Sequence, residues 1–182
     1  TMSVLDLKNK FDTLLKGLSA TPGPQFSTTV ESAYEAVVLA DVMQEYTRVH
    51  GGVISITPPA IGSFLNQAPG KFRTTSSFKI DFVDGQSFYF AADLELFGLV
   101  AMERRAPVGM LFEADVVVVF ENAANDIINN YNGYPAPHHV DFVLECKFGK
   151  YYKGQLRELL GLRRHISYLS GNNNTAVPSA EQ

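Results

Sequence analysis

The sequence predicts an α/β protein in which a central mixed β-sheet is flanked by helices. Apolar residues recur at helical spacing in the first 50 residues and again near the C-terminus, whereas the middle holds short runs rich in β-branched and aromatic residues. At 182 residues the chain is long enough for one substantial core. We therefore expect one domain at 1–170, with an N-terminal helix and linker at 1–24 and a disordered tail at 171–182.

Two helices are expected before the sheet. Apolar spacing predicts the first from Leu5 to Leu18. The second is expected from about Thr29 to His50, capped by Ser27 or Thr28 and ended by the glycines that follow His50. This second helix carries Glu31 and Glu35, whose simplest placement is an exposed helix face.

The remaining elements follow from β-propensity, turn residues and spacing. Asp84-Gly85 predicts a hairpin turn, so the strands on either side of it should pair antiparallel. The Asn- and Pro-rich segment 121–139 is expected to be a surface loop, and 154–169 a helix. The segments expected to form strands are 53–57, 72–82, 86–96, 111–120 and 140–148.

Composition limits the class of protein. Hydrophobic residues make up 46% of the chain, and no apolar stretch is long enough to cross a bilayer. Cys146 is the only cysteine, so an internal disulfide is impossible and a cytoplasmic location is expected. The net charge of −4 conceals six basic residues and one acid between Lys147 and His165. Such a local basic field suits a phosphate backbone, although a solvated helix face has the same composition.

Two predicted strands carry acids within apolar runs. The first contains Glu113 and Asp115, and the second contains Asp141 and the triplet Glu145-Cys146-Lys147. Burying an unpaired charge costs roughly several kcal/mol, so these acids need a hydrogen-bonding or oppositely charged partner. Alternation places Glu113 and Asp115 on one face, and pairing of the two strands would bring Asp115, Glu145 and Lys147 to a common edge. Carboxylates gathered beside a lysine are typical of a site for a hard divalent cation.

An apolar strand carrying Asp115, followed by a strand carrying Glu145-Cys146-Lys147, resembles the PD-(D/E)xK nuclease superfamily. An acid-bearing helix precedes the sheet and a basic helix follows the lysine, as in that superfamily. The sequence departs from the pattern at Ala114, where a proline is usual. Gln155 resembles the glutamine that follows the motif in the recombination-type exonucleases, but Leu159 stands where those exonucleases carry an aromatic residue, so this branch is not supported. The resemblance implies a restriction-endonuclease-like fold.

The resemblance also implies a function, the hydrolysis of phosphodiester bonds, most naturally in DNA. Asp115, Glu145 and Lys147 would be catalytic. Mg²⁺ or Mn²⁺ would be held by Asp115, Glu145 and the Cys146 carbonyl, with Glu113 or Glu35 as a further ligand, and Lys147 would orient the attacking water. A homodimer or a larger defence or repair complex would suit such an enzyme. The residues expected to contact nucleic acid are Lys150, Lys153, Gln155, Arg157 and Arg164.

Simpler interpretations exist for each residue. Glu145 and Lys147 could form an exposed ion pair on an edge strand, and Asp115 could cap a turn. Asp141 is too far along its strand to share an ion with Glu145, which favours a structural or rim role. The side chain of Cys146 is expected to point away from the site into the core. Adjacent histidines in a strand point to opposite faces, so His138-His139 does not favour zinc.

At the level of the whole protein two alternatives stay open. One is a nuclease-fold module that binds nucleic acid or assembles with partners without turnover of its own. The other is a domain of unrelated function whose acids are structural.

Overall fold

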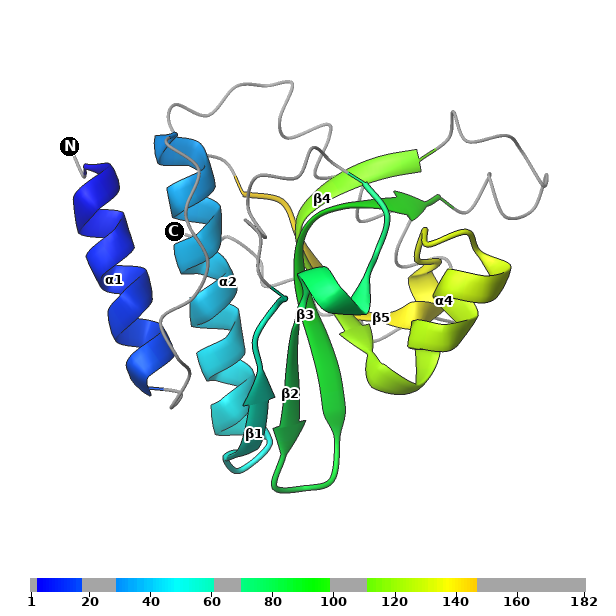
Figure 1. The fold of residues 1–182 in the computed structure, drawn as a ribbon, viewed down its shortest axis with the longest axis horizontal. Coiled ribbons are helices and arrows are strands. Elements are labelled where there is room, and N and C mark those ends of the chain that lie inside the picture. Colours follow the sequence, from blue (N-terminus) through cyan, green and yellow to red (C-terminus); the bar gives the residue numbers. More distant parts are fainter. Residues whose placement is uncertain (1–2, 18–28, 61–69, 99–110, 147–182) are drawn as a thin grey trace, which may run out of the picture.

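The structure is a computed structural model that describes residues 3–17, 29–60, 70–98 and 111–146. Figure 1 shows α1 (Val4–Gly17) beside α2 (Val30–Val49) on one side of a five-stranded sheet, with the short helix α4 (Ala124–Asn130) on the other. The strands are β1 (Val53–Thr57), β2 (Phe78–Phe82), β3 (Ser87–Phe97), β4 (Leu111–Phe120) and β5 (Val140–Leu144). The α/β character predicted from the sequence is confirmed.

The sheet is an antiparallel meander. Its strand order is β1-β2-β3-β4-β5, and all four pairings between these strands are antiparallel. The expectation of a mixed sheet is therefore wrong for the described strands, where the parallel contact is an isolated bridge between Gly70 and Leu94. Parallel pairing requires a crossover that carries the chain back to the same end of the sheet. Here each strand instead pairs with the next one in the sequence.

Helix α2 begins one residue later than predicted, with a different cap. Thr29 adopts an extended conformation, and its hydroxyl accepts a hydrogen bond from the Ser32 amide at 3.3 Å. Thr29 rather than Ser27 or Thr28 therefore satisfies an otherwise unbonded first-turn amide. The predicted glycine stop is confirmed: Gly51 has a φ of +75°, a conformation that costs little without a Cβ.

The Asp84-Gly85 hairpin and the predicted limits of β4 are confirmed, but two segments differ. Residues 72–77 form a coil and the 3₁₀ turn Thr74–Ser76 instead of the first half of a strand. The segment predicted as a surface loop at 121–139 contains α4 and the 3₁₀ turns Glu121–Ala123 and Pro137–His139. Buried Ala124 and Ile127 explain the difference, since they pack one face of α4 against the sheet.

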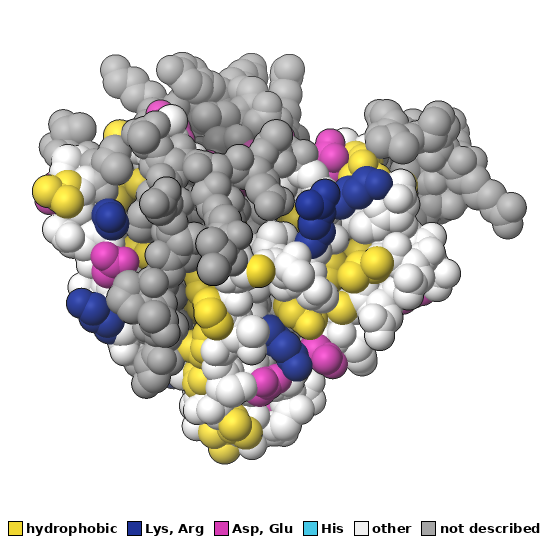
Figure 2. All heavy atoms as spheres, viewed as in Figure 1, with side chains coloured by type: hydrophobic (Ala, Val, Ile, Leu, Met, Phe, Trp, Pro, Cys, Tyr) yellow, Lys and Arg dark blue, Asp and Glu magenta, His cyan; other side chains and the backbone are white. Residues whose placement is uncertain are grey.

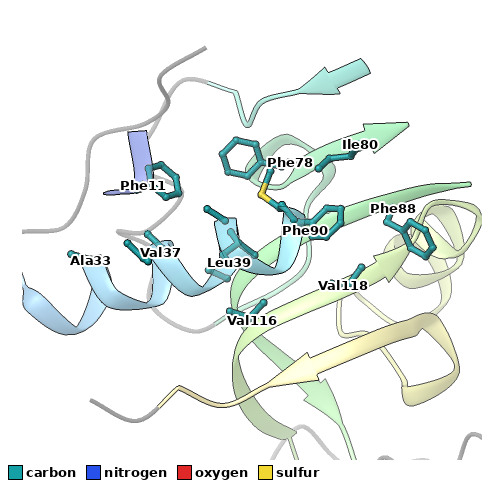
Figure 3. Packing of buried hydrophobic residues seen from close by; sticks show 14 of the residues in the cluster. Phe11, Ala33, Val37, Leu39, Phe78, Ile80, Phe88, Phe90, Val116 and Val118 are labelled. Atoms are coloured by element: carbon teal, nitrogen blue, oxygen red, sulfur yellow. The ribbon is translucent and has the colours of Figure 1, made fainter. Parts of the chain in front are cut away.

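Each face of the sheet has its own apolar core. On the α2 side, Leu39 and Met43 of the helix pack with Phe78 and Phe90 of the sheet, all fully buried, as part of the cluster in Figure 3. On the other side, Ile127 of α4 packs in a second cluster with residues of β3 and β4. Burial of one such side chain contributes roughly 1.5–3 kcal/mol. The two cores fix α2, β3, β4 and β5 as the frame for the acidic residues.

A search of the helices in the described ranges found none with both the length and the apolar character needed to cross a membrane.

Candidate functional site

The regular alternation of side chains is interrupted at the same level in β3 and β4. Ala92 packs in the α2-side cluster, whereas Leu94 packs in the opposite cluster. On β4, Val116 and Ala114 are divided between the two clusters in the same way. Residues two apart in a regular strand share a face, so each strand changes face at the residue between. Those two residues are Asp93 and Asp115.

Two acidic cross-strand pairs result. The register pairs Ala92 with Val116 and Leu94 with Ala114, which places Asp93 opposite Asp115, and the next acidic pair is Glu95 with Glu113. Carboxylate oxygens of Asp93, Glu113 and Asp115 all lie within 4.8 Å of one another. Like charges placed opposite each other destabilise a sheet, so this arrangement has no packing rationale of its own.

The backbone at Asp93 is unusual for a strand. Its φ is +51°, in the left-handed region that residues with a side chain seldom occupy. The Asp93 carbonyl accepts a hydrogen bond from Gly70 at 3.1 Å, and the Glu95 amide donates one to the Gly70 carbonyl at 2.9 Å. Hydrogen bonds to Gly70 on both sides of Leu94 therefore stabilise the backbone conformation at which the side chains of β3 switch from one face of the sheet to the other.

Glu35 of α2 and Glu145, just after β5, complete the group. Burial, followed by the negative charges of Asp93, Asp115, Glu113 and Glu145, raises the pKa of Glu35 to about 7. Burial, followed by the charges of Asp115, Glu113 and Glu145, also raises the pKa of Asp93 to about 7. We call Glu35, Asp93, Glu113, Asp115 and Glu145 the acidic centre. Asp115 is its most enclosed member, with 8% of its surface exposed.

Cys146 connects β5 to the acidic centre through its backbone. Its amide donates a hydrogen bond to Asp115 Oδ2, and its side chain packs against the α2-side core. Burial, together with the charges of Asp115, Glu35 and other acids, raises the pKa of the thiol to about 12, which keeps it protonated at neutral pH. The expected contact of the Cys146 side chain with the core is present, and the charges of the acids reach the thiol from the acidic centre.

The structure thus brings together four acids that the sequence singled out, namely Glu35, Glu113, Asp115 and Glu145. Glu35 is half-buried and does not occupy the exposed helix face expected for it, unlike Glu31 one turn earlier, which is exposed. The other candidates lie outside the described residues: Lys147, Lys150, Lys153, Gln155, Arg157 and Arg164.

Asp93 and Glu95 were missed by the sequence analysis. Both lie in a run, Phe-Ala-Ala-Asp-Leu-Glu-Leu-Phe, that is otherwise apolar, and a buried-strand pattern interrupted by acids was the available signal. Their position opposite Asp115 and Glu113 depends on the β3–β4 register. The long connection between these strands gives no turn motif from which that register could be read.

A second group of possible metal ligands consists of Asp126, His138 and His139. The two histidines lie in a 3₁₀ turn with ring centroids 4.0 Å apart, so the expectation of opposite faces is wrong because the segment is not a strand. The Ala136 amide donates to His139 Nδ1 at 3.0 Å, so Nε2 carries the proton and donates to Asp126 at 2.8 Å. A protonated Nε2 cannot bind a metal. This group is therefore a structural hydrogen-bond network.

Asp141 lies away from the acidic centre. It is exposed, and its Oδ2 accepts a hydrogen bond from the Tyr46 hydroxyl of α2 at 2.5 Å. The structural role predicted for Asp141 agrees with this contact.

No family model, curated protein or solved structure matches the chain.

Proposed function

We propose that this protein is a metal-dependent nuclease that hydrolyses phosphodiester bonds, with DNA as the favoured substrate. The observation that carries the proposal is the convergence of Asp115 and Glu145, the acids of the nuclease-like motif, with three further carboxylates from α2, β3 and β4. A restriction-endonuclease-like arrangement of the sheet and α2 is part of the same proposal.

The donor set fits a hard divalent cation. Asp93, Glu113 and Asp115 each offer a carboxylate oxygen to a shared site. Carboxylate oxygens are preferred ligands of Mg²⁺ and Mn²⁺. Burial first, and then the charges of the neighbouring carboxylates, raises the pKa values of Glu35 and Asp93, and a bound cation would offset the contribution from charge. Asp93, Glu113 and Asp115 would hold the ion, with Glu145 and Glu35 completing the set.

The roles of the chain's own groups follow from their positions. A bound cation supplies charge neutralisation at a phosphate and lowers the pKa of a water. Asp115 is buried and fixed by the Cys146 amide, so its carboxylate is held ready in one orientation. Lys147, two residues after Glu145 in the sequence, is assigned the role of orienting the water and balancing the negative charge.

The proposal of nucleic acid as substrate is supported by where the basic residues lie in the sequence. On the face drawn in Figure 2, the described basic and acidic side chains are interspersed and not separated by sign. The six basic residues between Lys147 and His165 are the cationic segment of the sequence, and they directly follow the acid motif. A phosphate backbone bound by this segment would lie close in sequence to Glu145, the last member of the acidic centre.

The test of this function is metal-dependent cleavage by the full chain. The protein is expected to bind Mn²⁺ in a calorimetric titration and to cleave single-stranded, duplex or branched DNA with Mg²⁺ or Mn²⁺. Cleavage should stop with a chelator. Ca²⁺ should support binding without cleavage, because its larger and looser coordination shell positions water less strictly. A protein that binds no Mn²⁺ and cleaves none of these substrates, nor RNA, is not a nuclease. Binding of DNA without turnover would support the alternative of a nuclease-fold binding module.

A separate prediction concerns affinity for nucleic acid. Neutralising Lys150, Lys153, Arg157 and Arg164 together should weaken duplex binding and flatten its salt dependence, since each lost phosphate contact lowers the slope by about 0.9. The measurement is the dissociation constant as a function of salt concentration.

The matched control neutralises four exposed basic residues elsewhere, namely Lys8, Lys16, Arg48 and Arg73. This control changes the net charge by the same amount. An equal loss of affinity in both variants would mean that overall charge, and not the segment after β5, governs binding.

A further inference from the structure

Helix α2 contacts β5 at a second place besides the acidic centre. Tyr46 and Glu35 lie about three helical turns apart on α2, which places them on the same side of the helix at a separation of about 16 Å. Along β5, Asp141 and Glu145 are separated by about 13 Å. The Tyr46 hydroxyl donates to Asp141 at 2.5 Å, while just after β5 Cys146 packs against the α2-side core and its amide donates to Asp115 Oδ2. The segment from Asp141 to Cys146 is therefore hydrogen-bonded to α2 at its start and to Asp115 of β4 at its end.

Asp141 is the additional residue of a β-bulge. Val118 pairs with Phe142, but Val119 pairs with Val140, so Asp141 is passed over in the β4–β5 register. The bulge changes which face the side chains occupy. Val140 packs in the cluster on the α4 side, whereas Phe142 packs against the cluster on the α2 side. Bulges redirect side chains in this way, and here the redirected carboxylate meets α2.

Tyr46 itself is held firmly. Its ring packs edge-on against Phe88 at 5.3 Å and Phe90 at 5.2 Å between centroids, and it stacks on His50 at 5.6 Å. Aromatic contacts of this geometry fix the ring independently of the hydroxyl. The phenol oxygen is therefore a fixed point on α2 to which β5 is attached.

We propose that Tyr46 is a positioning residue: its hydrogen bond to Asp141 fixes β5 along α2 so that Glu145 and Cys146 lie beside Glu35 and Asp115. For its effect on metal binding, this inference rests on the proposed function. Its effect on the placement of β5 does not, because the Cys146 amide contact to Asp115 is a feature of the fold.

The test uses the single cysteine of the full chain. Labelling with ¹⁵N-cysteine gives one backbone amide signal, that of Cys146, because the sequence has no other cysteine. Tyr46→Phe keeps the ring and removes the hydroxyl. This variant and Asp141→Ala should each speed hydrogen exchange of the Cys146 amide by about tenfold, and both should weaken Mn²⁺ binding. Asp141→Asn keeps an acceptor oxygen and should restore exchange toward the wild-type rate.

The matched control is Ser55→Ala. It removes another hydroxyl-to-carboxylate hydrogen bond of 2.5 Å, from Ser55 to Asp81, which lies on the face of the sheet away from α2. Cys146 exchange in Tyr46→Phe no faster than in Ser55→Ala would overturn the inference, as would faster exchange with unchanged Mn²⁺ affinity. A wild-type protein without Mn²⁺ binding would contradict the proposed function instead, while the exchange comparison would still decide the role of Tyr46.

Discussion

Replacement of Asp115 by asparagine is expected to lower the turnover of DNA cleavage on the order of a thousandfold with Mn²⁺. Changes to groups that merely orient metal ligands already cost about 10–100-fold, and Asp115 is the most enclosed carboxylate of the acidic centre. The substitution is nearly isosteric, and the asparagine oxygen can still accept from the Cys146 amide. The fold and the affinity for DNA should therefore survive while the charge at the ion is lost.

Parallel variants separate the contributions of the other residues. Glu145→Gln and Lys147→Ala should also lower turnover by orders of magnitude. Asp93→Asn tests a residue that the structure alone brings into the centre, and it should weaken Mn²⁺ affinity. The control is Glu45→Gln on α2, whose carboxylate is exposed and paired with Arg48. Turnover of Asp115→Asn within about threefold of this control would exclude a role for Asp115 in catalysis.

Replacement of Glu35 by glutamine is expected to stabilise the metal-free protein by about 1–2 kcal/mol above pH 7, because solvent screens part of the effect at this half-buried group, and by almost nothing near pH 4. The pKa of Glu35 is raised from 4.5 to about 7 in the folded protein. Below pH 4.5 the carboxyl is protonated in both the folded and the unfolded state. As the pH rises toward 7 the unfolded state loses the proton first, so the folded state becomes progressively less stable until its own carboxyl ionises. Glutamine removes this loss.

Denaturant unfolding with a chelator at pH 4.5, 6 and 8 measures the effect. Asp93, whose pKa is raised in the same direction, should show the same dependence. Glu31→Gln is the control, because Glu31 is exposed one turn earlier on α2. With saturating Mn²⁺ the sign should reverse, since Glu35→Gln then removes part of the cation's partner set. If the difference in the free energy of unfolding between Glu35→Gln and wild type did not vary with pH, the raised pKa of Glu35 would be contradicted.

The sequence predicted the elements wherever local signals are strong. The limits of β4 follow from its valine run, and the hairpin at Asp84-Gly85 follows from turn chemistry. Alternation predicted that Glu113 and Asp115 share a face, and their carboxylates do lie within 4.8 Å of each other, although β4 changes face at Asp115. Helix α4 was missed because Asn and Pro around it favour a loop, whereas burial of Ala124 and Ile127 against the sheet favours the helix.

The remainder of the site depends on contacts between distant segments. The strand register places Asp93 opposite Asp115, and the left-handed backbone at Asp93 redirects its side chain. Glu35 was assigned to an exposed face because helical periodicity does not say how far a neighbouring strand extends over the helix. The mixed sheet was expected from the order of helices and strands along the chain, and strand direction cannot be read from the strands themselves.

The order of the strands has a consequence for the synthesis of the chain. Because β1 to β5 pair in the order in which they occur in the sequence, each new strand can add to an edge that is already formed. The opposed acids of β3 and β4 can therefore come together before β5 is available. Glu145 and the Cys146 amide follow β5, the last of the described strands, so a chain that folds in this order holds an incomplete set of donors until β5 has been translated.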